Sequence, residues 1–143
     1  MAFNSYIKCN NILQVKVYDT QDPTQFSWVS LPDPQTMQIE TYDLDSEDGA
    51  GRDQSGLMFR DRRAVKEKLT CTFPPMWAGD YKELLSLLKD TFFEMKYFSP
   101  YYGGTRTATM YVGNRTAPWY YLHDPNNRNQ SWMQASSMNF IER

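Results

Sequence analysis

Residues 43–73 read DLDSEDGAGRDQSGLMFRDRRAVKEKLTCTF, and the last nine of them indicate a β fold. From Val65 onward Leu69, Cys71 and Phe73 fall on one side of a period-two pattern, and lysines and threonines fall on the other. This alternation is typical of a strand with one buried face. A core strand is therefore predicted over 65–73.

The first part of the same stretch, about 43–62, has a different character. An acidic block gives way to three glycines, and a basic block follows: Asp43, Asp45, Glu47 and Asp48, then Arg52, Arg60, Arg62, Arg63, Lys66 and Lys68. Irregular segments of about fifteen residues or more are uncommon in compact domains and are usually functional or disordered. We predict a long, flexible, charge-segregated loop that carries function but no chemistry.

The rest of the chain alternates in the same way at six further places. Strands are predicted over 11–19, 36–44, 92–98, 105–112, 117–122 and about 130–141, and 92–98 pairs with 105–112 as a hairpin. The segment 21–35 contains three X-Pro pairs and is predicted to be a loop without regular pairing, anchored by Phe26, Trp28 and Leu31.

One helix is predicted after the core strand. Asp80 and Glu83 have the spacing of a capping box at its start, and an apolar stripe follows at helical spacing: Tyr81, Leu84, Leu85, Leu88 and Phe92. The expected fold is mainly β (α+β), an antiparallel β-sandwich or split barrel of about seven strands with one helix packed on it. Residues 1–143 are expected to form a single domain.

Composition excludes several classes of protein. The net charge of −2 argues against a broad nucleic-acid surface, because such a surface needs uncompensated Lys and Arg. Two cysteines without a CxxC pair, and one histidine, argue against a disulfide framework or a zinc site and suit a reducing compartment. No apolar run approaches the roughly 18 residues needed to cross a bilayer, so membrane insertion is not expected.

Aromatic residues are unusually abundant, with ten tyrosines, four tryptophans and eight phenylalanines. Aromatic residues, Met and Arg are enriched at protein interfaces, which favours a self-assembling surface. The alternative is a β-rich domain with aromatic cross-strand pairs. Candidates for an aromatic interface are Trp28, Trp77, Trp119 and Tyr120.

No motif for catalysis, cofactor binding or metal binding stands out, and we predict no enzyme. His123 beside Asp124 has no nucleophile motif near it. The acidic block lacks the ligand order of a calcium loop, and the glycines do not form a GxGxxG between strand and helix. Cys71 is interpreted as a small buried hydrophobe.

The charge split of the loop allows two interpretations. The acidic and basic blocks form salt bridges within one hairpin, or the acidic block of one subunit meets the basic block of its neighbour. In the second case such pairs set the register of subunits, and a contact that closes by rotation gives a ring. The candidate intersubunit residues are Asp45, Glu47, Asp48, Arg52, Met58, Arg60, Arg62 and Arg63.

Four stretches in order carry a resemblance to a known family. They are D-x-E-D-x-x-G-R-x-x-x-G-x-M-x-x-x-R (45–62), FEMKY (93–97), T-x-T-x-x-x-Y-V-G-N-R-T-A-P (105–118) and NFIER (139–143). From about residue 36 onward the chain resembles small structural proteins from the tail-gene region of Gram-positive siphophages and prophages, and the predicted element order is similar to tail-tube and distal-tail ring proteins.

The resemblance implies a non-enzymatic tail component, expected to be a ring-forming distal-tail or baseplate-hub protein, with the major tail-tube protein as an alternative. It further implies a hexameric ring of this chain around a lumen through which DNA passes without sequence recognition. The implied partners are tube, tape-measure and tip or fibre proteins, and the implied location is the virion, after assembly in the bacterial cytoplasm.

Two other classes remain as alternatives. A carbohydrate-binding β domain of a tail tip would stack sugars on exposed rings such as Trp28, Trp77, Trp119 and Tyr120. A small hydrolase would depend on His123, although no partner nucleophile or carboxylate pair supports it.

Overall fold

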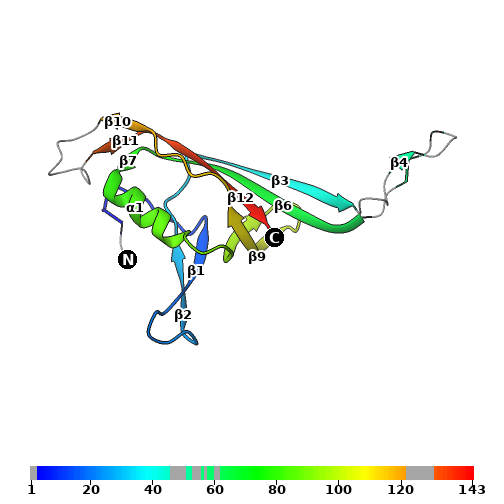
Figure 1. Ribbon diagram of the computed structural model, residues 1–143, viewed down its shortest axis with the longest axis horizontal. Helices are drawn as coiled ribbons and strands as arrows, with labels where there is room; N and C mark the ends of the chain where they lie inside the picture. The colour runs from blue at the N-terminus through cyan, green and yellow to red at the C-terminus, as the bar shows by residue number, and fades with distance from the viewer. Residues whose placement is uncertain (1–2, 46–50, 53–55, 57, 60–61, 122–130) are drawn as a thin grey trace.

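The computed structural model describes residues 3–45, 51–52, 56, 58–59, 62–121 and 131–143. These residues form twelve strands and one helix (Figure 1). In order they are β1 (Gln14–Tyr18), β2 (Phe26–Ser30), β3 (Thr36–Asp45), β4 (Gly51–Arg52), β5 (Met58–Phe59), β6 (Arg62–Phe73), β7 (Met76–Trp77), α1 (Ala78–Leu87), β8 (Phe93–Ser99), β9 (Gly104–Val112), β10 (Trp119–Tyr121), β11 (Trp132–Met133) and β12 (Ser136–Glu142). The prediction of a mainly β fold with one helix is confirmed.

Seven strands form one antiparallel sheet in the order β2-β1-β8-β9-β12-β6-β3. The predicted hairpin is present, with β8 and β9 paired from Phe93 and Met110 to Ser99 and Gly104. Gly103 has a φ of 71° in the turn, a conformation that glycine adopts without steric cost. Two smaller sheets, β10-β11-β7 and β4-β5, complete the described strands.

The large sheet is curled. The Tyr97 hydroxyl on β8 donates to Glu67 on β6 at 2.6 Å, although β9 and β12 lie between these two strands in the sheet. The enclosed side chains and one face of α1 form a single apolar cluster, which includes Leu69, Cys71 and Phe73 of β6 as predicted. The core therefore lies inside the curl, closed on one side by the helix.

The prediction for 21–35 was wrong in one part. Residues 26–30 form strand β2, which pairs with β1 in continuous register from Gln14 and Ser30 to Tyr18 and Phe26. Pro23, Pro32 and Pro34 all lie outside the strand, so no backbone donor within it is lost. β2 is also an edge strand, which needs a partner on one side only.

The predicted start of the helix was also wrong. α1 begins at Ala78, its N-cap residue Trp77 makes no side-chain capping bond, and the Ala78 amide donates instead to the Ser131 carbonyl at 2.9 Å. Asp80 lies inside the first turn and is buried. The buried face consists of Tyr81, Leu84, Leu87 and Leu88, whereas Phe92 lies beyond the helix and is exposed.

Strand boundaries differ from the predictions near both ends of the sheet. The segment predicted as one strand over about 130–141 is divided into β11 and β12, which belong to different sheets. β3 continues to Asp45 and β6 begins at Arg62, so the predicted loop over about 43–62 is shorter at both ends. Within it, β4 pairs with β5.

Candidate interaction surfaces

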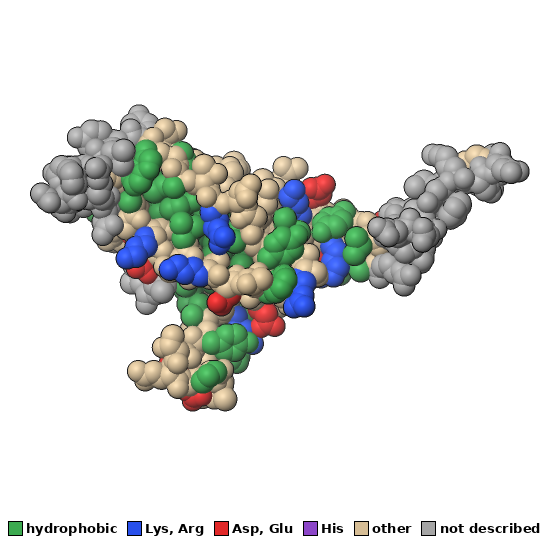
Figure 2. Space-filling model, viewed as in Figure 1, with side chains coloured by type: hydrophobic (Ala, Val, Ile, Leu, Met, Phe, Trp, Pro, Cys, Tyr) green, Lys and Arg blue, Asp and Glu red, His purple; other side chains and the backbone are tan. Residues whose placement is uncertain are grey.

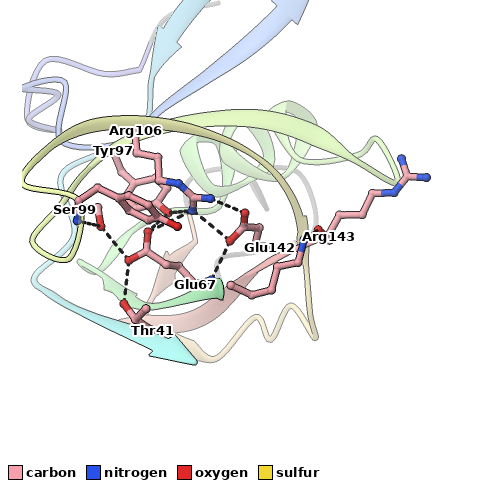
Figure 3. A network of polar contacts seen from close by, with 9 residues as sticks. Thr41, Glu67, Tyr97, Ser99, Arg106, Glu142 and Arg143 are labelled. Carbon is pink, nitrogen blue, oxygen red and sulfur yellow. Dashed lines mark hydrogen bonds and ion pairs between the residues drawn. The ribbon is translucent and has the colours of Figure 1, made fainter. Parts of the chain in front are cut away.

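A polar network lies at one end of the curled sheet. Its residues come from five strands and are Thr41, Glu67, Tyr97, Ser99, Arg106 and Glu142 (Figure 3). Glu67 has no exposed surface. Strand alternation places it on the inner side of β6, in the same register as Leu69, Cys71 and Phe73, so its carboxylate is directed into the core.

Each oxygen of the Glu67 carboxylate accepts two hydrogen bonds. Oε1 accepts from Tyr97 at 2.6 Å and Arg106 at 3.2 Å, and Oε2 accepts from Ser99 at 2.8 Å and Thr41 at 3.0 Å. A carboxylate offers about four acceptor sites, so all of them are used. No face of Glu67 is left for a substrate, and the network is a device for closing the fold.

Arg106 joins the two carboxylates of the network. Its Nη2 donates to Glu142 Oε1 at 2.6 Å, and the backbone amide of Glu67 donates to Glu142 Oε2 at 2.8 Å. Burial alone would raise the pKa of Glu67, but the hydrogen bonds from Tyr97, Ser99 and Thr41 and the charge of Arg106 outweigh it, so the pKa lies below its usual value. Glu67 is therefore ionised and paired.

The sequence contained a signal for this network that the prediction did not use. Glu67, Arg106 and Glu142 each occupy an inward position of an alternating strand, where their neighbours at i±2 are apolar. A charged residue in an apolar register must find a partner, because burying it unpaired is costly. Three such residues on three strands indicate one shared site.

A second anchor ties the N-terminal segment to the start of α1. Asn4 donates to the Asp80 carboxylate through its backbone amide at 3.2 Å and through Nδ2 at 3.0 and 2.9 Å. The Tyr6 hydroxyl donates to Asp80 Oδ2 at 2.5 Å and accepts from the Trp77 amide at 2.9 Å. Burial and the hydrogen bond to Asp80 raise the pKa of Tyr6 to about 12.

Tyr6 also belongs to an aromatic cluster at the surface. Its ring centroid lies 5.5 Å from that of Trp77 and 5.9 Å from that of Trp132, and the two tryptophans are 6.2 Å apart. Trp77 keeps 40% of its surface exposed. The cluster therefore presents partly open rings beside the helix start.

The predicted aromatic interface is not one surface. Trp28 lies on β2 in the large sheet, where the Lys96 ammonium covers its ring at 4.2 Å. Trp77 packs with Trp132, whereas Trp119 lines a groove with Met133. The side chain of Tyr120 lies outside the described part of the chain. The structure thus places the three described tryptophans at three different sites.

The groove lined by Trp119 runs between α1 and the β10-β11 pair. Its lining, which we call the helix groove, consists of Ala78, Tyr81, Lys82, Leu85, Ser86, Lys89, Ala117, Trp119 and Met133, and its volume is about 280 Å³. Trp119 is 41% exposed. Lys89 also borders a neighbouring pocket of about 390 Å³ that contains Phe92, Tyr111 and Arg115.

At the other side of the sheet, β3 and β6 continue beyond their neighbour. The last β6 residue paired with β12 is Lys68, whereas β3 and β6 pair on to Asp45 and Arg62. We call residues 42–45 and 62–66 the arm. Leu44, on the edge strand, is 47% exposed.

The predicted intersubunit residues lie in or beyond this arm. Asp45 and Arg62 are paired in backbone register, Arg52 and Met58 face each other in β4 and β5, and Arg63 belongs to β6. Their side chains are not described. Glu47, Asp48, Arg60 and His123 lie outside the described residues.

Searches for other kinds of site give no candidate within the described chain. Its residues form no group of three or more His, Cys, Asp or Glu side chains that could hold a metal ion. Its one helix is too short and too polar to cross a membrane. Comparison with protein-family models, curated proteins and solved structures found no match.

Proposed function

We propose that this protein is a non-enzymatic structural component of a bacteriophage tail, namely a ring-forming distal-tail or baseplate-hub protein. The observation that carries the proposal is the open sheet. β2 and β3 each have a single neighbour among the described strands, so the large sheet ends in two edges. One of these edges, β3, is ten residues long.

A long unpaired edge strand is a template for pairing with another chain, and soluble monomers usually cover or interrupt such edges. The arm strengthens this argument, because an isolated two-stranded ribbon is only marginally stable in water. Edges at both ends of one sheet allow each subunit to contact two others, as a ring requires. The order of elements supports the same assignment by analogy, which is a weaker argument than the edges.

In this proposal the chain assembles with itself, as a hexamer, and with tube, tape-measure and tip or fibre proteins. It resides in the virion after assembly in the bacterial cytoplasm, and DNA passes the lumen without specific contacts. A major tail-tube protein is the alternative within the same class, since it would use the same edges.

The test is the mass of the purified protein by light scattering over a wide concentration range, followed by negative-stain imaging. Rings of six or tubes are expected, and immunogold labelling should place the protein on phage tails. A monomer at every concentration would contradict self-assembly, and labelling absent from tails would contradict the assignment to the virion.

A carbohydrate-binding domain is a second candidate because of the partly open rings of Tyr6, Trp77 and Trp132. Aromatic faces are used for sugar stacking, but the tilts between these rings, 59° and 40° from Tyr6, do not form one flat platform. Binding on a glycan array that is lost in Trp77→Ala would favour this candidate.

A further inference from the structure

We propose that the arm of one molecule inserts Leu44 into the helix groove of a second copy, so that copies join head to tail. This inference rests on the proposed self-assembly and names the two surfaces that meet. Neither surface is assigned by the edge-strand argument above, which concerns backbone pairing. The contact proposed here is made by side chains.

The helix groove has the composition of a receptor for an apolar, acidic segment. Its floor includes Leu85, Ala117 and Met133, and its rim carries two exposed lysines, Lys82 and Lys89. No carboxylate lines it. In a chain of net charge −2, this is a local reversal of sign. Figure 2 shows Lys and Arg side chains gathered at the α1 end of the molecule, beside hydrophobic ones.

The arm offers the complementary chemistry. Leu44 is an exposed apolar residue between two aspartates, Asp43 and Asp45, on the edge strand. Because β3 is the edge and β6 lies behind it, a partner meets the acidic strand of the arm before the basic one. Charges attract over about 10 Å at 0.1 M salt, so the lysine rim attracts both aspartates even though strand alternation directs them away from Leu44.

Geometry requires that the two surfaces belong to different molecules. Along the longest axis of the molecule, α1 with β10 and β11 lies at one end, and β3 and β6 run toward the other (Figure 1). An arm therefore cannot reach the groove of its own chain. A contact between unlike surfaces of identical copies is heterologous, and it produces a ring or an open chain of subunits.

The contact is small. A groove of about 280 Å³ holds one or two side chains, and interfaces of low buried area are weak and transient when they act alone. We therefore expect assembly to depend steeply on protein concentration, with Leu44 as a central anchor and the lysines as a rim that directs approach.

The test uses one variant of each surface and a matched control for each. Leu44→Asp removes the arm's anchor, and Lys82→Glu reverses one rim charge. The controls are Ile12→Asp, an aliphatic residue of similar exposure, and Lys8→Glu, an exposed lysine outside the groove. Circular dichroism checks that each variant is folded, and sedimentation velocity measures its assembly.

We expect L44D and K82E each to raise the concentration of half-assembly by at least about tenfold, and both controls to assemble like the wild type. The decisive sample is an equal mixture of L44D and K82E. It retains one intact arm and one intact groove per pair, so it should form a dimer and stop there. Growth of the mixture into larger assemblies would contradict the head-to-tail contact.

Failure of this inference differs from failure of the proposed function. If the wild type forms rings and both variants form the same rings, the arm-to-groove contact is wrong and self-assembly stands. If the wild type is monomeric at every concentration, self-assembly is wrong and the contact is wrong with it.

Discussion

Glu67 and Arg106 lie on strands that are not neighbours in the sheet, yet their side chains meet at 3.2 Å. The contact spans the curl of the sheet across β12, and Glu142 of that strand joins it from the other side of the guanidinium. The network thus holds together four strands whose backbone pairing alone does not determine how tightly the sheet bends.

Removing Glu67 should therefore destabilise the protein strongly. In Glu67→Ala the hydroxyls of Tyr97 and Ser99 lose their acceptor and Arg106 loses one of its two anions. Breaking a buried pair by removing one partner costs about 3–5 kcal/mol. Urea unfolding measures this free energy. Glu94→Ala is the control, since Glu94 pairs with Lys16 at the surface and its loss should cost about 0–1 kcal/mol.

The same carboxylate should make stability depend on acid. The pKa of Glu67 is lowered in the folded chain, so the unfolded chain binds its proton more readily. Its contribution is fully present above the ordinary glutamate pKa of about 4.3 and is lost as the pH falls through the lower folded value. Unfolding free energies of wild type and Glu67→Gln should converge as the solution becomes acidic. Parallel curves would show that Glu67 is not the titrating group.

The N-terminal anchor should depend on a single hydroxyl. Tyr6→Phe keeps the ring beside Trp77 but removes the donor to buried Asp80 and the acceptor of the Trp77 amide. Losing a hydrogen bond to a buried charged group costs about 1–3 kcal/mol, which a lower thermal midpoint would report. Tyr101→Phe, at an exposed tyrosine, should change stability by less than about 0.5 kcal/mol.

The two thiols should react differently with a thiol reagent. Cys9 is exposed and Cys71 is fully buried, with its pKa raised to about 12 by burial. One thiol per chain should react in the native protein and two after denaturation. Native Cys9 should react more slowly than a free cysteine, because partial burial and Asp33 raise its pKa. Two rapidly reacting native thiols would contradict the burial of Cys71.

The charge split near the arm gives a prediction about assembly. Replacing Arg60, Arg62 and Arg63 with glutamate converts the basic block to an acidic one, so subunits that meet acidic block to basic block should repel. Light scattering should show smaller assemblies, and circular dichroism an unchanged fold. An unchanged oligomer size would remove charge complementarity between these blocks as an explanation of assembly.

Period-two alternation was sufficient to predict most of the large sheet. β3, β6, β8 and β9 were all found because one face of each is apolar, and the β8-β9 hairpin followed from the glycines between them. Strand β2 was missed because prolines on both sides dominated the local pattern, although none of them lies within the five paired residues.

The errors at the helix and the network have a common origin in long-range contacts. Asp80 has the local spacing of a cap, but its partners Asn4 and Tyr6 are more than seventy residues away. Glu67 looked like one more charged residue in a lysine-rich strand, because its partners are on other strands. Local pattern reports local structure, and neither partner is visible in it.

The anchor between the N-terminal segment and α1 also sets an order of events during synthesis. Asn4 and Tyr6 leave the ribosome long before Asp80 does, and until Asp80 emerges they have no carboxylate to bind. β1 waits in the same way, since its partner β8 begins at Phe93. The part of the chain that is translated first is thus among the last to be fixed, and a growing chain stalled before residue 80 keeps this end exposed to chaperones and proteases.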